Sequence, residues 1–140
     1  MYLGLDLGTT AIKGVLIDDS QNIVAAATRI VTTELGSNGW AEQNPSNWIG
    51  AAVQVFGELR SSAPSAFRKT QAISLSGQMH TLVALDETHK PLRPAILWND
   101  TRGAEWCESV LRSRYSAVIG YRRSSHVEFY SGQTWLAEAE

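Results

Sequence analysis

The sequence contains a single cysteine, Cys107, among its 140 residues. One cysteine excludes a disulfide within the chain, and the residues around it lack the spacing of a metal site. The chain also lacks a large excess of charge of either sign, because 12 Lys and Arg residues nearly balance 14 Asp and Glu residues, for a net charge of −2. A chain without a basic excess lacks the electrostatic footprint of a nucleic-acid-binding protein, so no nucleic-acid partner is expected.

Long apolar runs are absent as well. No stretch of eighteen apolar residues and no secretory leader pattern occurs, so the sequence predicts no membrane partner and a cytoplasmic location. Apolar residues nevertheless make up 44% of the chain, which is enough to build a core at the length of one domain. Tryptophan is unusually frequent, with five in the chain.

The first eighteen residues predict a β-hairpin whose tip can hold phosphate. Two short apolar runs rich in branched side chains flank the tripeptide Gly8-Thr9-Thr10. Gly8 is expected to supply the backbone freedom of a tight connection. Thr9 and Thr10 offer hydroxyls and backbone N–H groups to an anion, and Lys13 can add a positive charge.

Asp6 lies just before this tip, within an apolar strand. A carboxylate in a buried strand is costly without a partner, and at a phosphate site the natural partner is Mg²⁺ or its water shell. The residues alone leave a second interpretation equally open. It is an ordinary hairpin in which Asp6 takes part in turn hydrogen bonds.

The rest of the chain predicts further strands and two helices. Asn44 and Pro45 are typical of an N-cap and a first helical residue, and apolar residues recur on one helical face from there to about Arg60. A second helix is expected over 102–114. The further strands expected are 21–33, 71–76, 81–85 and 95–98. The segments 34–39 and 61–69 are expected to be a loop and a link.

Four segments, in order, resemble motifs of the FGGY family of carbohydrate kinases. They are D-L-G-T-T-A-I-K from Asp6, W-A-E-Q-N-P-S-N-W from Trp40, G-Q-M-H from Gly77 and R-P-A-I-L-W-N-D-T-R from Arg93. The last two resemble the branch of the family that acts on xylulose. The resemblance implies an α/β chain of the actin-like, ribonuclease H-like ATPase fold, of which only the N-terminal lobe is present: a mixed sheet with antiparallel hairpins and flanking helices.

The activity implied by this resemblance is phosphoryl transfer from ATP to a primary hydroxyl of D-xylulose, with Mg²⁺ as the metal. Asp6 would be the catalytic residue that organises the metal. The residues that would hold the phosphates are Gly8, Thr9, Thr10 and Lys13. The residues that would bind the sugar are Gln78, Met79, His80, Trp98, Asn99, Asp100 and Arg102.

The residues by themselves leave the sugar-binding roles open. An exposed His after a strand is more often inert, and a Trp is more often part of a core than of a ligand site. Asn99, Asp100 and Arg102 can bind sugar hydroxyls directly, or cap the next helix and pair with one another. Thr81 stands where the xylulose branch usually has Gly, so kinases of gluconate or glycerol stay as alternatives. A further alternative is a non-catalytic nucleotide-binding module.

The resemblance ends near Tyr121, so the expected domains are an incomplete kinase domain over 1–119 and a tail over 120–140. For plausible codons, a shift of one nucleotide turns 125–140 into H-M-S-N-F-T-A-G-K-L-G-W-L-K-R, which resembles the missing family segment. We therefore hypothesise a frameshift near 120–123, with a genuine divergent terminus as the alternative. A frameshifted tail is expected to pack loosely.

The resemblance also implies that the general base and the adenine-binding lobe of the family lie beyond residue 140. A chain with half of an active site is expected not to turn over alone. The face that would contact the missing part is expected to be exposed, so self-association into a homo-oligomer is an outcome that the sequence leaves open.

Overall fold

The computed structural model describes residues 1–104 and 135–138. Two helices lie in this part of the chain, α1 (Pro45–Ser62) and α2 (Pro64–Phe67). The strands are β1 (Tyr2–Leu7), β2 (Ala11–Ile17), β3 (Ile23–Ile30), β4 (Glu34–Leu35), β5 (Ala41–Gln43), β6 (Ala72–Gly77), β7 (Leu82–Leu85), β8 (Ala95–Ile96) and β9 (Trp135–Glu138). None of the helices in the described residues is long and apolar enough to cross a membrane.

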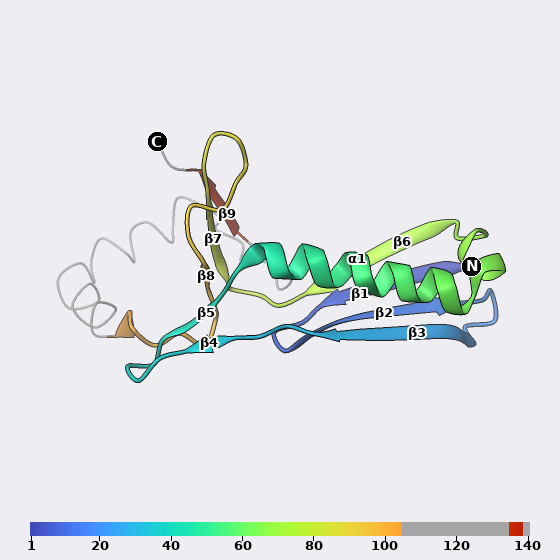
Figure 1. The fold of residues 1–140 in the computed structure, drawn as a ribbon, viewed down its shortest axis with the longest axis horizontal. Helices are drawn as coiled ribbons and strands as arrows, with labels where there is room; N and C mark the ends of the chain where they lie inside the picture. Colours follow the sequence, from blue (N-terminus) through green and yellow to red (C-terminus); the bar gives the residue numbers. More distant parts are fainter. Residues whose placement is uncertain (105–134, 139–140) are drawn as a thin grey trace, which may run out of the picture.

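These strands form two separate sheets (Figure 1). The four-stranded sheet has the order β3-β2-β1-β6, and the five-stranded sheet has the order β4-β5-β8-β7-β9. In the first sheet β1 pairs antiparallel with β2 and parallel with β6. The expected mixed sheet with antiparallel hairpins is therefore confirmed, whereas the sequence did not indicate that the strands divide between two sheets.

Helix α1 covers one face of the four-stranded sheet, over β2 and β3. Its start is as predicted: Asn44 is the N-cap, and its Oδ1 accepts a hydrogen bond from the Ser46 N–H at 2.9 Å. Gly14 of β2 lies directly against the helix, because a Cβ there would stand 2.4 Å from Val55 Cγ1. The missing side chain of Gly14 therefore sets how near α1 can pack.

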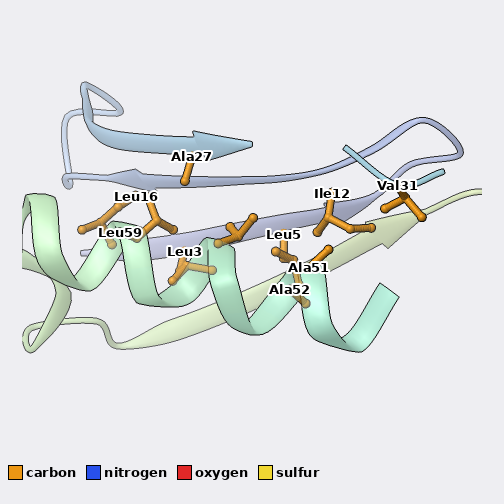
Figure 2. Close-up of a cluster of buried hydrophobic side chains, with 10 residues drawn as sticks. Leu3, Leu5, Ile12, Leu16, Ala27, Val31, Ala51, Ala52 and Leu59 are labelled. Atoms are coloured by element: carbon orange, nitrogen blue, oxygen red, sulfur yellow. The ribbon is translucent and has the colours of Figure 1, made fainter. Parts of the chain in front are cut away.

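The core lies between α1 and this sheet (Figure 2). Leu and Ile side chains from β1 and β2 point toward the small and branched side chains of the helix. The buried residues of the core are Leu3, Leu5, Ile12, Leu16, Ala27, Val31, Ala51, Ala52, Val55 and Leu59. Because side chains alternate along a strand, Gly4 and Asp6 face the opposite side of the sheet, where an open groove of about 520 Å³ lies.

Two segments expected to be irregular contain regular structure. The expected loop 34–39 begins with β4, whose Leu35 pairs with Ala41 of β5. In the expected link 61–69, α1 continues to Ser62 and α2 follows. Both predictions were wrong in these parts because a strand of two residues and a helix of four are too short to show a hydrophobic period.

The C-terminal predictions are tested only in part. The helix expected over 102–114 lies outside the described residues except at its start. Of the tail, residues 135–138 form β9, which pairs in parallel with β7. The rest of the tail lies outside the described residues, and the expectation of loose packing stays a prediction.

Candidate functional site

The tip of the β1–β2 hairpin lies beside the end of β6. The backbone N–H of Gln78, just after β6, donates to the carbonyl oxygen of Leu7 at 3.0 Å. Gly8 is required here for space and not for conformational freedom, since its φ is not in the left-handed range and a Cβ would stand 2.9 Å from the Ala11 carbonyl oxygen. The expectation that Gly8 supplies backbone freedom is therefore wrong, and its contact with phosphate stays a prediction.

Asp6 is half-buried on the open face of the sheet. The hydroxyl of Ser76 on β6 donates to Asp6 Oδ1 at 2.9 Å, and Lys13 is the register partner of Asp6 on β2. The carboxylate is therefore bound across the sheet, not in a turn as the ordinary-hairpin interpretation expected. Because the Asp6 carboxylate is half-exposed, it needs no metal to offset the cost of burial. The cost of burying a carboxylate is therefore no longer a reason to expect a metal at Asp6.

No group of three or more His, Cys, Asp or Glu side chains in residues 1–104 could hold a metal ion by itself. A lone carboxylate still fits Mg²⁺, because this ion commonly keeps several waters and is bound by one or two carboxylates together with substrate phosphates. Asp6 fits that pattern better than it would fit a protein-only cage.

Thr9 joins the predicted phosphate residues to two of the predicted sugar residues. The indole N–H of Trp98 donates to Thr9 Oγ1 at 3.1 Å, and the Thr9 hydroxyl donates to Gln78 Oε1 at 3.2 Å. Thr81 donates to the same Gln78 oxygen at 3.1 Å. The departure from the family pattern at Thr81 is thus a buried hydroxyl that holds Gln78 in place.

Gln43 is the residue of this site that the sequence analysis missed. Its Nε2 donates to the Thr9 carbonyl oxygen at 2.6 Å and to Thr33 Oγ1 at 2.7 Å, and its Oε1 accepts from the Trp48 indole N–H at 2.7 Å. The signal available was the segment W-A-E-Q-N-P-S-N-W itself, which was interpreted only as the entry to a helix. The contact with Thr9 joins residues 34 positions apart, so it leaves no local pattern in the sequence.

Apolar surface is exposed next to this network. Met79 follows Gln78 directly and is 40% exposed, and Trp98 is 59% exposed although its indole nitrogen is bonded. His80 adopts a left-handed backbone conformation with φ of 59°. A residue other than Gly in that region carries a small strain. The chain bends here, between β6 and β7.

Asp100 and Arg102 pair with each other, as one of the two alternatives expected. The Arg102 guanidinium reaches both oxygens of Asp100, with Nη2 to Oδ2 at 2.7 Å, and lies 4.9 Å from the ring centroid of Trp40. The same Nη2 donates to Glu42 Oε1 at 2.6 Å, and Arg93 also pairs with Glu42. Asn99 is exposed within the turn between Leu97 and Asp100.

These ion pairs shift the titration of both acids. Hydrogen bonds from Arg102 hold the pKa of Asp100 well below its ordinary value, and the Ala41 backbone N–H adds to this effect at 2.9 Å. Burial alone would raise the pKa of Glu42, but the hydrogen bond from Arg102 and the charge of Arg93 outweigh burial and lower it. Both carboxylates are therefore ionised at neutral pH and link β5 to the segment after β8.

The structure thus brings one group of predicted site residues together and leaves another apart. Thr9, Gln78 and Trp98 are in direct contact, and Asp6 lies just before Thr9 on the same hairpin. Lys13 is exposed on β2 beside Asp6. Asp100 and Arg102 belong instead to the cluster around Glu42, and direct sugar contact by these two residues stays a prediction.

Comparison with known proteins places these features in one family. Residues 1–134 match the N-terminal domain of the FGGY family of carbohydrate kinases. A xylulose kinase of Lactococcus lactis is 39% identical over 140 residues, which are 99% of this chain and 28% of that protein. A crystal structure of a xyloylose kinase from Brucella ovis matches with a TM-score of 0.75 and 43% identity, over 85% of this chain and 25% of that chain. A gluconate kinase from Lactobacillus acidophilus matches with a TM-score of 0.76 and 30% identity, over 86% and 24% of the two chains.

Proposed function

This chain belongs to the FGGY family of carbohydrate kinases, and we propose that it supplies the phosphate loop and part of the sugar-binding surface of an ATP-dependent xylulose kinase. The observation that carries the proposal is the Trp98–Thr9–Gln78 network. A kinase must hold a phosphate group and a sugar hydroxyl within reach of each other. Thr9 is the residue at which the loop and the exposed surface of Trp98 meet.

In this proposal the backbone N–H groups of the hairpin tip bind the phosphates of ATP. Asp6 would hold Mg²⁺ through its coordinated waters, and that ion would neutralise charge on the phosphates as the phosphoryl group is transferred. Met79 and Trp98 offer apolar surface to the carbon face of the sugar, and His80 offers a ring nitrogen to a hydroxyl. The chain contributes positioning and charge stabilisation, which are the main needs of phosphoryl transfer.

D-xylulose is the sugar that the G-Q-M-H and R-P-A-I-L-W-N-D-T-R segments favour, and the curated xylulose kinase of Lactococcus lactis supports it. Gluconate is a second candidate, because the gluconate kinase from Lactobacillus acidophilus matches the fold equally well. Thr81 bears on this choice, since it holds Gln78 next to Met79 and His80.

The chain spans 28% of the length of the Lactococcus lactis relative and about a quarter of the matched crystal structures. We propose that the general base and the adenine-binding lobe are not among these 140 residues, and that the chain alone does not turn over. Sugar-dependent ATP consumption by the purified chain that is lost on Asp6→Ala would overturn this part of the proposal. A cytoplasmic location and self-association stay predictions.

Ligand-dependent stability tests whether the chain binds what the proposal requires. A ligand that binds only the folded chain raises its unfolding temperature. Mg-ATP is expected to raise that temperature in the unaltered chain and to lose most of this effect in Asp6→Asn. Asp19→Asn, at an exposed position in the β2–β3 turn, is the matched control. D-xylulose, D-gluconate and glycerol are compared in the same way, and stabilisation by none of the three would count against a sugar site on this chain.

A further inference from the structure

Gln43 stands at the junction of the two sheets. It is the last residue of β5 in the five-stranded sheet, where it pairs with Ala95 of β8, and Asn44 after it caps α1. Its side chain reaches out of that sheet to the carbonyl oxygen of Thr9, in the hairpin tip of the other sheet. Only 1% of Gln43 is exposed, so no water competes for its amide.

The partners of this amide permit only one orientation. An indole N–H can only donate, so the atom that faces Trp48 must be the oxygen. A carbonyl oxygen can only accept, so the atom that faces Thr9 must be the nitrogen. The second hydrogen of Nε2 goes to Thr33 Oγ1 at 2.7 Å. A flipped amide would place oxygen against the Thr9 carbonyl oxygen.

The hydrogen bond from Gln43 to the Thr9 carbonyl oxygen also fixes the orientation of the peptide group between Thr9 and Thr10. The Thr9 carbonyl and the Thr10 N–H belong to the same planar trans peptide, in which C=O and N–H point in opposite directions. Because the Thr9 carbonyl points toward the buried Gln43 amide, the Thr10 N–H points away from it. The Thr9 hydroxyl is held independently by Trp98 and Gln78, so the peptide cannot easily rotate.

We propose that Gln43 is a positioning residue that orients the Thr9–Thr10 peptide so that the Thr10 N–H faces the bound phosphate. The inference rests on the proposed phosphate-binding role of the hairpin tip. Gln43 does not touch the phosphate in this view. Gln43 acts through Thr9. It also connects the phosphate loop to the five-stranded sheet, in which Gln43 pairs with β8, the strand that precedes Trp98.

The test compares two variants that break different bonds of the same amide. Gln43→Glu keeps the shape and an acceptor for Trp48, and while its carboxylate is ionised it cannot donate to the Thr9 carbonyl. Thr33→Val removes the other acceptor of Nε2 and leaves the Thr9 bond intact. The readouts are the backbone amide resonance of Thr10 and the indole N–H resonance of Trp98 in nitrogen-labelled chain without ligand, followed by titration with Mg-ATP.

Gln43→Glu is expected to shift both resonances and to weaken Mg-ATP binding about tenfold, as for the loss of one hydrogen bond to a charged group. Thr33→Val is expected to move neither resonance and to bind as the unaltered chain does. Should Gln43→Glu fail to fold or take up a proton, Gln43→Met, which has no side-chain donor, takes its place with the same expectation. An unmoved Thr10 amide, or equal effects in both variants, overturns the inference. If the unaltered chain does not bind Mg-ATP, the proposal that this chain binds phosphate by itself fails, while the resonances still decide whether Gln43 orients the loop.

Discussion

The indole nitrogen of Trp98 lies 3.1 Å from the hydroxyl oxygen of Thr9, although 89 positions of sequence separate the two residues. Trp98 follows β8 of the five-stranded sheet, and Thr9 lies in the hairpin tip of the four-stranded sheet. The bond therefore connects the two sheets at the point where the proposed phosphate and sugar sites meet. It also keeps the exposed indole ring at a defined angle to the loop.

The first prediction concerns the Thr9 hydroxyl. Thr9→Val keeps the shape of the side chain but removes the acceptor of Trp98 and the donor to Gln78, so we expect the free energy of unfolding to fall by about 1–2 kcal/mol. Thr9→Ser keeps the hydroxyl and is expected to lose much less. Urea unfolding followed by tryptophan fluorescence measures both values. A larger loss in Thr9→Ser than in Thr9→Val would show that the methyl group, and not the hydroxyl, matters here.

The second prediction concerns the close approach of α1 to β2. A Cβ on Gly14 would stand 2.4 Å from Val55 Cγ1 and 3.0 Å from Leu59 Cδ1, so Gly14→Ala is expected to destabilise the chain by about 1–3 kcal/mol. Gly57→Ala is the matched control, because nothing lies within 4 Å of its Cβ position on α1. That change is expected to stabilise the chain by about 0.5–1 kcal/mol. Thermal unfolding of both variants separates steric overlap from helix propensity, and a neutral Gly14→Ala would contradict the packing described.

The third prediction concerns stability in acid. Because Arg102 holds the pKa of Asp100 below its ordinary value, the unfolded chain binds this proton more readily than the folded chain does. The stabilisation is therefore complete above about pH 5 and is lost as the pH falls below about 4, the ordinary pKa of Asp. In Asp100→Asn the free energy of unfolding should be lower at pH 7 and should fall less steeply between pH 5 and 3. Asp19→Asn serves as the exposed control, and an unchanged acid slope in Asp100→Asn would argue against the ion pair.

The fourth prediction concerns the reading frame of the gene segment that encodes the tail, residues 120–140. If a frameshift lies near 120–123, a change of one nucleotide in the gene restores a reading like H-M-S-N-F-T-A-G-K-L-G-W-L-K-R, and that reading continues into a longer open frame. Sequencing the locus from the codon of Ile119 past the codon of Glu140 measures this directly. If no single-nucleotide change restores that segment, the frameshift hypothesis is wrong.

Much of the first sheet and its helix could be predicted because the signals are local. Alternating apolar residues mark β1 and β2, and the Asn44-Pro45 cap with a period of about 3.6 residues marks α1. The candidate residues Asp6, Thr9, Gln78 and Trp98 were recognised from motifs that are continuous in the sequence. The short elements β4 and α2 gave no such signal, since each is shorter than one hydrophobic repeat.

By itself, the amino-acid sequence determined the first hairpin, the capped helix that covers it and the family to which the chain belongs. These properties depend on neighbours within a few residues or on contiguous motifs. Only the tertiary structure decided that the strands divide into two sheets, that Asp100 and Arg102 join Glu42, and that the Gln43 amide holds the Thr9 carbonyl. The physical reason is that a hydrogen bond between residues 34 to 89 positions apart depends on how whole elements pack, and no local pattern of residues records that packing.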